Sequence, residues 1–427
     1  MTRVIVAGGG AVGLCVAEAL SARGQEVVVL EAGRVGAGAS AGNAGWITPS
    51  LSIPVPAPGV LSTSVRWLVT RSGPLWIRPT LEPMMLRWLL SFLRSCRRPV
   101  YARSLSALQL LASGAGRAFD RLGERGARFE RHDEPLLYPA FESGELTALR
   151  RVAADLAAAR GAAAMRELSR GELRSLEPTL GDGVLGGMVA DGEGRVRPET
   201  FTQAVQALLR QRGVEIHEHS PVSALRSDGS GWRVRTPSGE HRAASVALAT
   251  GAAARRLLRP LGVDLPVVNA KGYSRTFPRT ETRDTPQPRR ALYLEAPRVA
   301  ISAFDDAVRI SGGLELGARG LDLSHRRLAA ITAAAAWALP GWAIPGAGVD
   351  WAGMRSLSPD GLPYIGPAPG MRGVHIATGH ATLGITLAPL TAELLADLML
   401  EGRDTPARAA VDPARAVRRQ AARGPSA

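Results

Sequence analysis

The first 31 residues of the sequence constrain its fold more than any other stretch. Residues 3–7 are a short, apolar and largely β-branched run, which is typical of a buried parallel strand. Residues 8–13 follow at once and place three glycines at the spacing G-x-G-x-x-G. Residues 11–23 have helical composition, and residues 27–30 are a second apolar run that ends at Glu31. This order predicts a β-α-β unit with a glycine-rich turn between its first strand and its helix.

The glycines and the acid of this unit together predict a dinucleotide site. Gly8 allows the tight turn, Gly10 lets a pyrophosphate approach the backbone, and Gly13 lets the helix pack closely on the strand. The N-terminus of the helix offers free N–H groups and a positive dipole end to the phosphates. The Glu31 carboxylate can accept hydrogen bonds from the ribose hydroxyls and would repel a 2′-phosphate, which argues against NADP. The unit alone does not separate FAD from NAD.

Length and composition bound the class of protein. A chain of 427 residues with 45% hydrophobic and 21% charged residues predicts a globular protein of two domains. Cys15 and Cys96 have no metal-ligand spacing and cannot form a disulfide framework, and we expect no bound metal. The sequence enters its first strand directly and holds no run of about 18 uninterrupted apolar residues. We therefore expect no signal peptide, no membrane-spanning helix and a cytoplasmic location.

The net charge of +14 raises the question of an anionic partner. Lys271 is the only lysine, so the basicity is almost entirely arginine. The arginines are spread along the chain and no basic block alternates with aromatic residues, which argues against a nucleic-acid partner. An anionic membrane surface remains a candidate partner.

Three further stretches carry signals of their own. Residues 34–45, called here the small-residue loop, favour a loop that wraps a ligand closely. Proline-rich residues 53–59 predict an extended connector out of the first domain. Residues 65–98 mix Trp, Met and Leu with arginine. They predict either two helices that cover a second domain, with Trp and Met in the core, or an interfacial anchor at the inner face of a membrane.

Four runs resemble a known flavoprotein superfamily. Residues 351–366 include Trp-Ala-Gly-Met-Arg and Ser-Pro-Asp-Gly-Leu-Pro, and residues 377–386 are Ala-Thr-Gly-His-Ala-Thr-Leu-Gly-Ile-Thr. Both resemble the flavin segments of the D-amino-acid oxidase superfamily. Residues 43–49 and 271–274 resemble the small subunit of bacterial D-amino-acid dehydrogenase more than the oxidases. The resemblance extends over nearly the whole chain.

The resemblance implies an α/β fold with two domains, each assembled from separated segments. A Rossmann-like FAD-binding domain would comprise residues 1–58, 146–258 and 349–427. A discontinuous α+β substrate domain would comprise residues 59–145 and 259–348, with an antiparallel sheet and lid helices over the flavin.

FAD is the cofactor that the resemblance implies, without a covalent link because no cysteine lies near these segments. Gly8, Gly10 and Gly13 would hold its pyrophosphate and Glu31 its ribose. The other implied cofactor-binding residues are Ser40, Asn43, Ala44, Gly45, Val222, Gly251, Gly379, Leu383, Gly384, Ile385 and Thr386. The N–H groups of residues 379 and 383–386, together with the N-terminus of the following helix, would stabilise the anionic reduced flavin.

Arg355 lies within the flavin signature and is the candidate for substrate binding. A guanidinium pairs with a carboxylate through two parallel hydrogen bonds and so fixes the orientation of an amino acid. Tyr273 would add a phenol donor to the same carboxylate. His380 and Tyr138 are weaker candidates for the catalytic site.

The implied reaction is oxidation of the C–N bond of a D-amino acid or an N-substituted α-amino acid. A hydride passes to flavin N5, and the imine is hydrolysed to a 2-oxo acid and ammonia. Ser356 stands where the dehydrogenase signature usually has proline, which leaves the substrate open. One alternative is an O₂-dependent oxidase of a glycine- or sarcosine-like or biosynthetic secondary amine. Another is a non-redox dinucleotide-binding module.

Glu315 bears on the electron acceptor. Oxygen-reactive members of the superfamily align a lysine near this position, and a carboxylate beside the flavin would have the opposite charge. Glu315 would otherwise face outward on an antiparallel strand. Together with the membrane interpretation of residues 65–98, the carboxylate predicts a quinone acceptor and a slow reaction with O₂.

Overall fold

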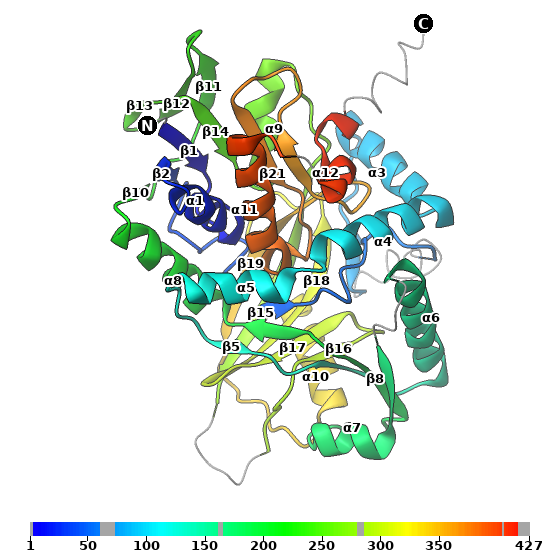
Figure 1. Ribbon diagram of the computed structural model, residues 1–427. Coiled ribbons are helices and arrows are strands. Elements are labelled where there is room, and N and C mark those ends of the chain that lie inside the picture. The colour runs from blue at the N-terminus through cyan, green and yellow to red at the C-terminus, as the bar shows by residue number, and fades with distance from the viewer. Residues whose placement is uncertain (1–2, 60–72, 161–164, 280–285, 404, 417–427) are drawn as a thin grey trace, which may run out of the picture.

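The computed structural model describes residues 3–59, 73–160, 165–279, 286–403 and 405–416. These residues form two large sheets, one above the other in Figure 1, with helices around them. Residues 65–72, the first part of the stretch with the membrane interpretation, lie outside the described residues.

The upper sheet grows from the predicted β-α-β unit. β1 (Arg3–Ala7) pairs in parallel with β2 (Glu26–Leu30) on one side and with β14 (Ser245–Leu248) on the other. The full order is β10-β2-β1-β14-β21-β20. The outer strands are β10 (Glu215–His217), β21 (Val374–Thr378) and β20 (Tyr364–Pro367), of which only β20 is antiparallel. Apolar residues are buried on both faces of this sheet, as in other sheets covered on both sides.

Helices cover one face of the upper sheet and a small sheet covers the other. α1 (Ala11–Ser21), α8 (Pro198–Gln211) and α11 (Gly384–Glu401) pack with one set of alternate strand residues. On the other face lie the antiparallel strands β11 (Ala224–Ser227), β12 (Trp232–Thr236) and β13 (Gly239–Ala243), with α9 (Ala253–Leu258) and the 3₁₀ turn Arg259–Leu261. A two-residue turn at Pro237–Ser238 joins β12 to β13, because Thr236 pairs with Gly239.

The lower sheet has nine strands in the order β19-β15-β18-β17-β16-β6-β8-β7, with β4 also paired to β18. Its strands are β19 (Val349–Leu357), β15 (Val268–Pro278), β18 (Ala307–Leu316), β17 (Val299–Ala303), β16 (Leu292–Leu294), β6 (Leu136–Ala140), β8 (Gly186–Ala190), β7 (Arg166–Ser169) and β4 (Leu75–Ile77). β16, β17 and β18 follow one another along the chain and pair as antiparallel neighbours. A second small sheet joins β3 (Trp46–Ile47), β9 (Gly194–Val196) and β5 (Arg131–His132).

The sheets divide the chain differently from the predicted domain bounds. β7, β8 and β19 lie within segments assigned to the FAD-binding domain from the sequence, but they pair in the lower sheet. The bounds of the two domains themselves stay a prediction.

Different helices cover the two faces of the lower sheet. α10 (His325–Ala338) packs on one face through Leu328 and Ile331. α3 (Pro83–Ser95) packs at one end of the other face. α4 (Arg98–Ala112), α5 (Ala115–Glu124), α6 (Ser143–Arg160), α7 (Arg170–Leu176) and α12 (Pro406–Val411) complete the helices of the described residues. Ser113 and Gly114 separate α4 from α5.

α3 is apolar on two faces. Met85, Trp88 and Phe92 are buried against the lower sheet, which is the core position expected for Trp and Met. Leu90 is 52% exposed, and Leu86 and Leu93 on the same side of the helix are exposed as well. No helix among the described residues is both long enough and apolar enough to cross a membrane.

Candidate cofactor and substrate site

The glycine-rich turn lies at the carboxyl edge of the upper sheet and has no room for side chains at two of its glycines. A Cβ on Gly13 would overlap the carbonyl oxygen of Gly8, so α1 could not lie where it does. Gly8 has φ +106°, and a Cβ there would meet the backbone of Ala249. The close helix–strand approach that the sequence predicts for this turn is therefore present.

Glu31 and its neighbours form one end of the site. The Glu31 carboxylate accepts hydrogen bonds from the N–H of Gly9 at 2.5 Å and of Gly33 at 2.8 Å, which ties it to the glycine-rich turn. The N–H of Ser220 donates to the Glu31 carbonyl at 2.7 Å. Val222, two residues on, is buried in the core beside the end of β2. The segment around Val222, an implied cofactor-binding residue, thus runs beside the acid proposed for the ribose.

Two helix N-termini open at the same edge. α1 follows β1 and α11 begins shortly after β21, and these strands run parallel in one sheet. Neither Gly10 nor Leu383, which precede the two helices, caps its helix with a side-chain hydrogen bond. Ser40 Oγ accepts from the N–H of Ala11 at 3.0 Å. The remaining first-turn N–H groups, among them those of Gly384 and Ile385, suit the phosphates and polar ring atoms of a flavin dinucleotide.

The loop before α11 is joined to the rest of the site by hydrogen bonds. The N–H of Gly379 donates to Ser356 Oγ at 3.1 Å. The hydroxyl of Thr386 donates to the Trp46 carbonyl at 2.8 Å, which ties the first turn of α11 to β3. The carbonyl of Gly251, after β14, accepts from the Thr378 hydroxyl at 2.8 Å. The separated segments expected to line the cofactor therefore meet.

The small-residue loop is held by the lower sheet. Arg309 on β18 donates from Nη1 to the carbonyls of Ala41 at 2.9 Å and Asn43 at 2.8 Å. Ser302 on β17 donates to the carbonyl of Ala44 at 2.7 Å. Sequence reasoning missed Arg309 and Ser302, because only the tertiary structure brings these strands to the loop.

Within the loop, local hydrogen bonding fixes the turn that ends it. Asn43 Oδ1 accepts from the N–H of Gly45 at 2.8 Å. Gly45 has φ +77°, and a Cβ there would overlap the carbonyl of Val196. The sequence Asn43-Ala44-Gly45 is thus required by the turn as well as by any ligand.

The face of the lower sheet toward this loop carries small residues between large ones. One row of the register across five strands is Tyr293, Ala300, Ser311, Ser274 and Trp351. The hydroxyls of Ser274 and Ser311 are buried and have no hydrogen-bond partner among the described residues. Buried hydroxyls are rarely left unsatisfied, so these two fit a bound polar group. The arrangement is compatible with FAD and a small substrate between the two sheets.

Arg355 lies on this same face of β19. Gly272 lies on the neighbouring strand, and a Cβ there would overlap the Arg355 guanidinium. The guanidinium can lie in this position only because residue 272 has no side chain. Arg355 Nη1 donates to the Gly313 carbonyl at 3.2 Å, and no carboxylate pairs with Arg355 within the described part of the chain. Desolvation by the surrounding protein lowers the pKa of this arginine. A half-buried cation without a counter-ion is suited to bind an anionic ligand.

Tyr293 is a second site residue that sequence reasoning missed. Burial raises the pKa of its phenol, while the positive charges of Arg298 and Arg355 oppose the rise. The sequence marked Tyr293 only as part of a strand. Its relation to Arg355 depends on how β16 and β19 approach one another across the sheet.

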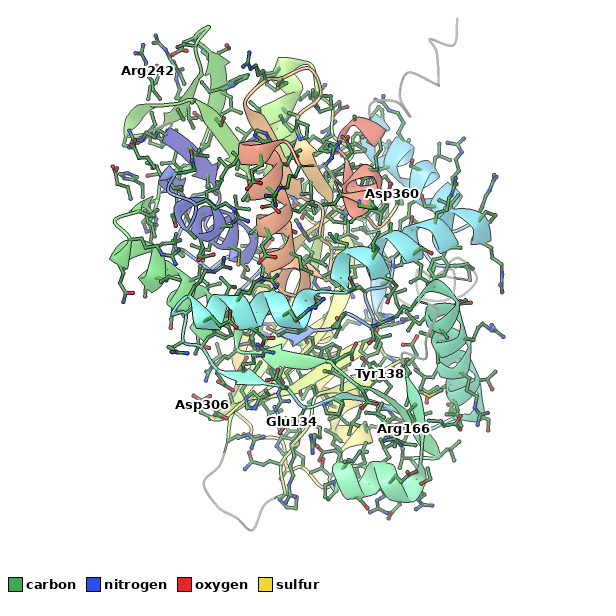
Figure 2. The ribbon with its side chains drawn as sticks, viewed as in Figure 1. Glu134, Tyr138, Arg166, Arg242, Asp306 and Asp360 are labelled. Atoms are coloured by element: carbon green, nitrogen blue, oxygen red, sulfur yellow. The ribbon has the colours of Figure 1, made fainter. Side chains whose placement is uncertain are left out.

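Tyr138, a weaker candidate from the sequence, is buried in the lower half of the molecule (Figure 2), where its ring contacts that of Tyr293. The two rings are 6.2 Å apart between centroids. The Tyr138 hydroxyl donates to the carboxylate of Glu193 at 3.0 Å. Burial raises the pKa of Glu193 to about 8. We therefore place Tyr138 in the wall of the site.

Tyr273 does not join Arg355. It pairs with Ala352 across β15 and β19, three residues from Arg355, and so lies on the opposite face of the sheet. It packs there with Leu328 of α10. Burial and the negative charge of Glu315 raise the pKa of Tyr273. The two side chains cannot bind one carboxylate together, contrary to the expectation from the sequence.

Glu315 lies on that opposite face as well. It pairs with Lys271 at 3.5 Å and with Arg327 of α10. The carboxylate is neutralised on the side of the sheet away from the small-residue loop. It therefore carries no argument about how the flavin reacts with O₂.

His380 is occupied by a contact within its own segment. Its Nε2 lies 3.0 Å from the hydroxyl of Thr391 on α11, and burial lowers the pKa of the imidazole to about 4. The side chain is 6% exposed. These features describe a neutral histidine that anchors α11, and they assign it no contact with a substrate.

Comparisons with known proteins agree with this geometry. A family model described as "DAO: FAD dependent oxidoreductase" matches residues 3–398. The D-amino acid dehydrogenase of Methylobacterium nodulans is 33% identical over 406 residues, which are 93% of this chain and 95% of that protein. The D-amino acid dehydrogenase of Vibrio cholerae is 29% identical over 418 residues, with 96% and 98% covered.

Solved structures give the same picture of the fold. The glycine oxidase of Geobacillus kaustophilus has a TM-score of 0.72 at 25% identity and covers 95% of this chain and 96% of its own. The L-proline dehydrogenase of P. horikoshii has a TM-score of 0.73 at 18% identity, with 98% of each chain covered, which supports the fold alone.

The glycine-rich turn generates a testable prediction about FAD. Gly13→Ala should lower the FAD content of the purified protein at least tenfold, because the added Cβ overlaps the Gly8 carbonyl and must push α1 away from the turn. Flavin absorbance per mole of protein measures the content. Gly144→Ala in the first turn of α6 is the control, since nothing lies within 4 Å of a Cβ there. Equal FAD content in both variants would contradict the prediction.

Proposed function

The chain belongs to the DAO family of FAD-dependent oxidoreductases, and from that premise we propose that it oxidises the C–N bond of an α-amino acid. Arg355 is the observation that carries the substrate class, because it is a half-buried guanidinium with no carboxylate partner among the described residues. D-amino acids are the proposed substrates, since the relatives with about 30% identity are named D-amino acid dehydrogenase. N-substituted α-amino acids, which also carry a carboxylate, are the alternative.

The protein's part in this reaction is mainly to bind and orient. When bound, FAD supplies the two-electron acceptor for the hydride of the α-carbon. Arg355 would hold the substrate carboxylate, which fixes the α-carbon relative to the small-residue floor around Ser274 and Ser311. Tyr293 would border the carboxylate from the other side. Packing of the two sheets around the bound substrate would exclude water from the hydride transfer, and the released imine is hydrolysed to a 2-oxo acid and ammonia.

For the electron acceptor we propose a quinone reached through a peripheral membrane contact at the inner face of the membrane. Glu315 no longer supports this acceptor, because it faces α10. The support is the exposed leucine face of α3, beside a cavity of about 500 Å³ lined by Arg78, Arg255, Arg256, Arg259 and Arg319. Arg255 pairs with Asp264 and Arg319 with Glu82. An apolar stripe beside arginines is the composition that binds anionic lipid surfaces.

Anaerobic mixing tests the reaction directly. The purified flavoprotein is mixed without O₂ with D-amino acids, L-amino acids and N-methyl or cyclic amino acids, and flavin absorbance is followed. D-amino acids should bleach the flavin fastest. If no amino acid in the panel bleaches it, the proposed activity is wrong and a non-redox role gains support.

The same reduced protein tests the acceptor. Reoxidation by a soluble quinone should outpace reoxidation by air-saturated buffer by at least tenfold in stopped flow. Air reoxidation as fast as turnover, with one hydrogen peroxide formed per substrate, would identify an oxidase instead.

Arg355 generates a prediction about substrate affinity. Arg355→Leu should raise KM for the substrate. It should also weaken the binding of competitive carboxylate inhibitors by about 2–4 kcal/mol, the loss expected when one partner of a buried charged pair is removed. FAD content should not change. Tyr273→Phe is the matched control, because Tyr273 faces α10 and should leave KM within about twofold. An unchanged KM in Arg355→Leu would show that the substrate carboxylate binds elsewhere.

A further inference from the structure

Arg309 is a buried arginine of the lower sheet that contacts both the small-residue loop and α8. It is 3% exposed. Besides the two loop carbonyls of Ala41 and Asn43, it donates from Nε to the Thr276 hydroxyl at 2.9 Å and from Nη2 to the carboxylate of Glu199 in the first turn of α8. The carboxylate neutralises the buried charge, so the guanidinium is free to act as a rigid set of donors.

The contact of Arg309 with two carbonyls fixes the direction of two peptide groups. In a planar trans peptide, the N–H of the next residue points away from the carbonyl oxygen. The carbonyls of Ala41 and Asn43 point at Nη1 of Arg309, so the N–H groups of Gly42 and Ala44 point away from it. Neither N–H group has a hydrogen-bond partner in the part of the chain that the structure describes.

Two unpartnered donors in an enclosed loop are unusual. Gly42 is buried, with the Trp351 ring packed where a Cβ would be. A buried backbone N–H without a partner costs about 1–3 kcal/mol, so such groups are normally satisfied by protein, water or a ligand. The same loop places Ser40 Oγ at the N-terminus of α1. The donors therefore lie on a loop that also contacts the proposed phosphate site.

We propose that Arg309 is a positioning residue for the cofactor, which presents the N–H groups of Gly42 and Ala44 to acceptor oxygens or ring atoms of FAD. This inference rests on the proposed FAD site. Ser302 supports the same loop from the next strand through the Ala44 carbonyl. Lysine could not replace Arg309, because its single ammonium cannot reach two carbonyls, a hydroxyl and a carboxylate at once.

FAD binding to the apoprotein tests the proposal. The dissociation constant for FAD is measured by quenching of flavin fluorescence for wild type, Arg309→Lys, Arg309→Gln and Ser302→Ala. We expect FAD affinity to fall roughly tenfold or more in the Arg309 variants, which equals about 1.4 kcal/mol, and less in Ser302→Ala. The visible flavin spectrum of the reconstituted Arg309→Lys protein should shift, because the donors around the ring or its phosphates have changed.

Arg275→Gln is the matched control. Arg275 lies on the adjacent strand β15 and pairs with Asp350 through two hydrogen bonds, on the face away from the loop. Its loss should lower thermal stability without changing FAD affinity. Glu199→Gln separates the ion pair from the loop contact and should weaken FAD less than Arg309→Lys.

The remaining outcomes distinguish a failure of the Arg309 proposal from a failure of the proposed FAD site. Wild-type FAD affinity and an unchanged spectrum in Arg309→Lys would overturn the inference while leaving the proposed function intact. A wild-type protein that binds no FAD would overturn the proposed site itself. If Arg309→Gln does not fold, Arg309→Lys and Ser302→Ala still decide the question.

Discussion

The hydrogen bonds between Arg309 and the small-residue loop are the contact on which the site depends. The loop leaves the upper sheet after β2, and its carbonyls at Ala41 and Asn43 are held by a strand of the lower sheet. A second set of hydrogen bonds, between the loop before α11 and Ser356 of β19, joins the two halves of the site at another point. The Glu199 carboxylate neutralises the buried guanidinium of Arg309. The contact between the sheet and the loop therefore combines an ion pair with hydrogen bonds.

The alternation of side chains along β15 and β19 decides which residues can meet a substrate. Arg355, Gly272 and Trp351 lie on the face toward the loop, while Tyr273 lies on the face toward α10. On the loop side the side chains are small, and the hydroxyls of Ser274 and Ser311 have no hydrogen-bond partner within the described ranges. On the α10 side the polar groups Lys271, Glu315 and Arg327 neutralise one another. One face is thus prepared for a ligand and the other for packing.

α3 reconciles the two interpretations of the Trp- and Arg-rich stretch. Trp88 stacks with Phe92, with ring centroids 5.3 Å apart, and both are buried against the lower sheet. Leu90 points the other way and is more than half exposed. The helix covers the end of the site next to Arg355 and still offers an apolar surface beside a cavity rich in arginine. Both interpretations can hold for α3, because different side chains of one helix form its buried face and its exposed face.

The sequence by itself determined the parts whose chemistry is local. The spacing of Gly8, Gly10 and Gly13 requires the β-α-β turn, because helix and strand can approach only where no Cβ intervenes. The signature around Arg355 likewise indicated the family and the residue that we propose to bind the substrate carboxylate. The tertiary structure alone decided which distant residues join them. Arg309, Ser302 and Tyr293 carry no local signal, since strand register and sheet packing bring them to the loop and to Arg355. The same register places Tyr273 on the opposite face, because an odd step along a strand reverses the direction of a side chain.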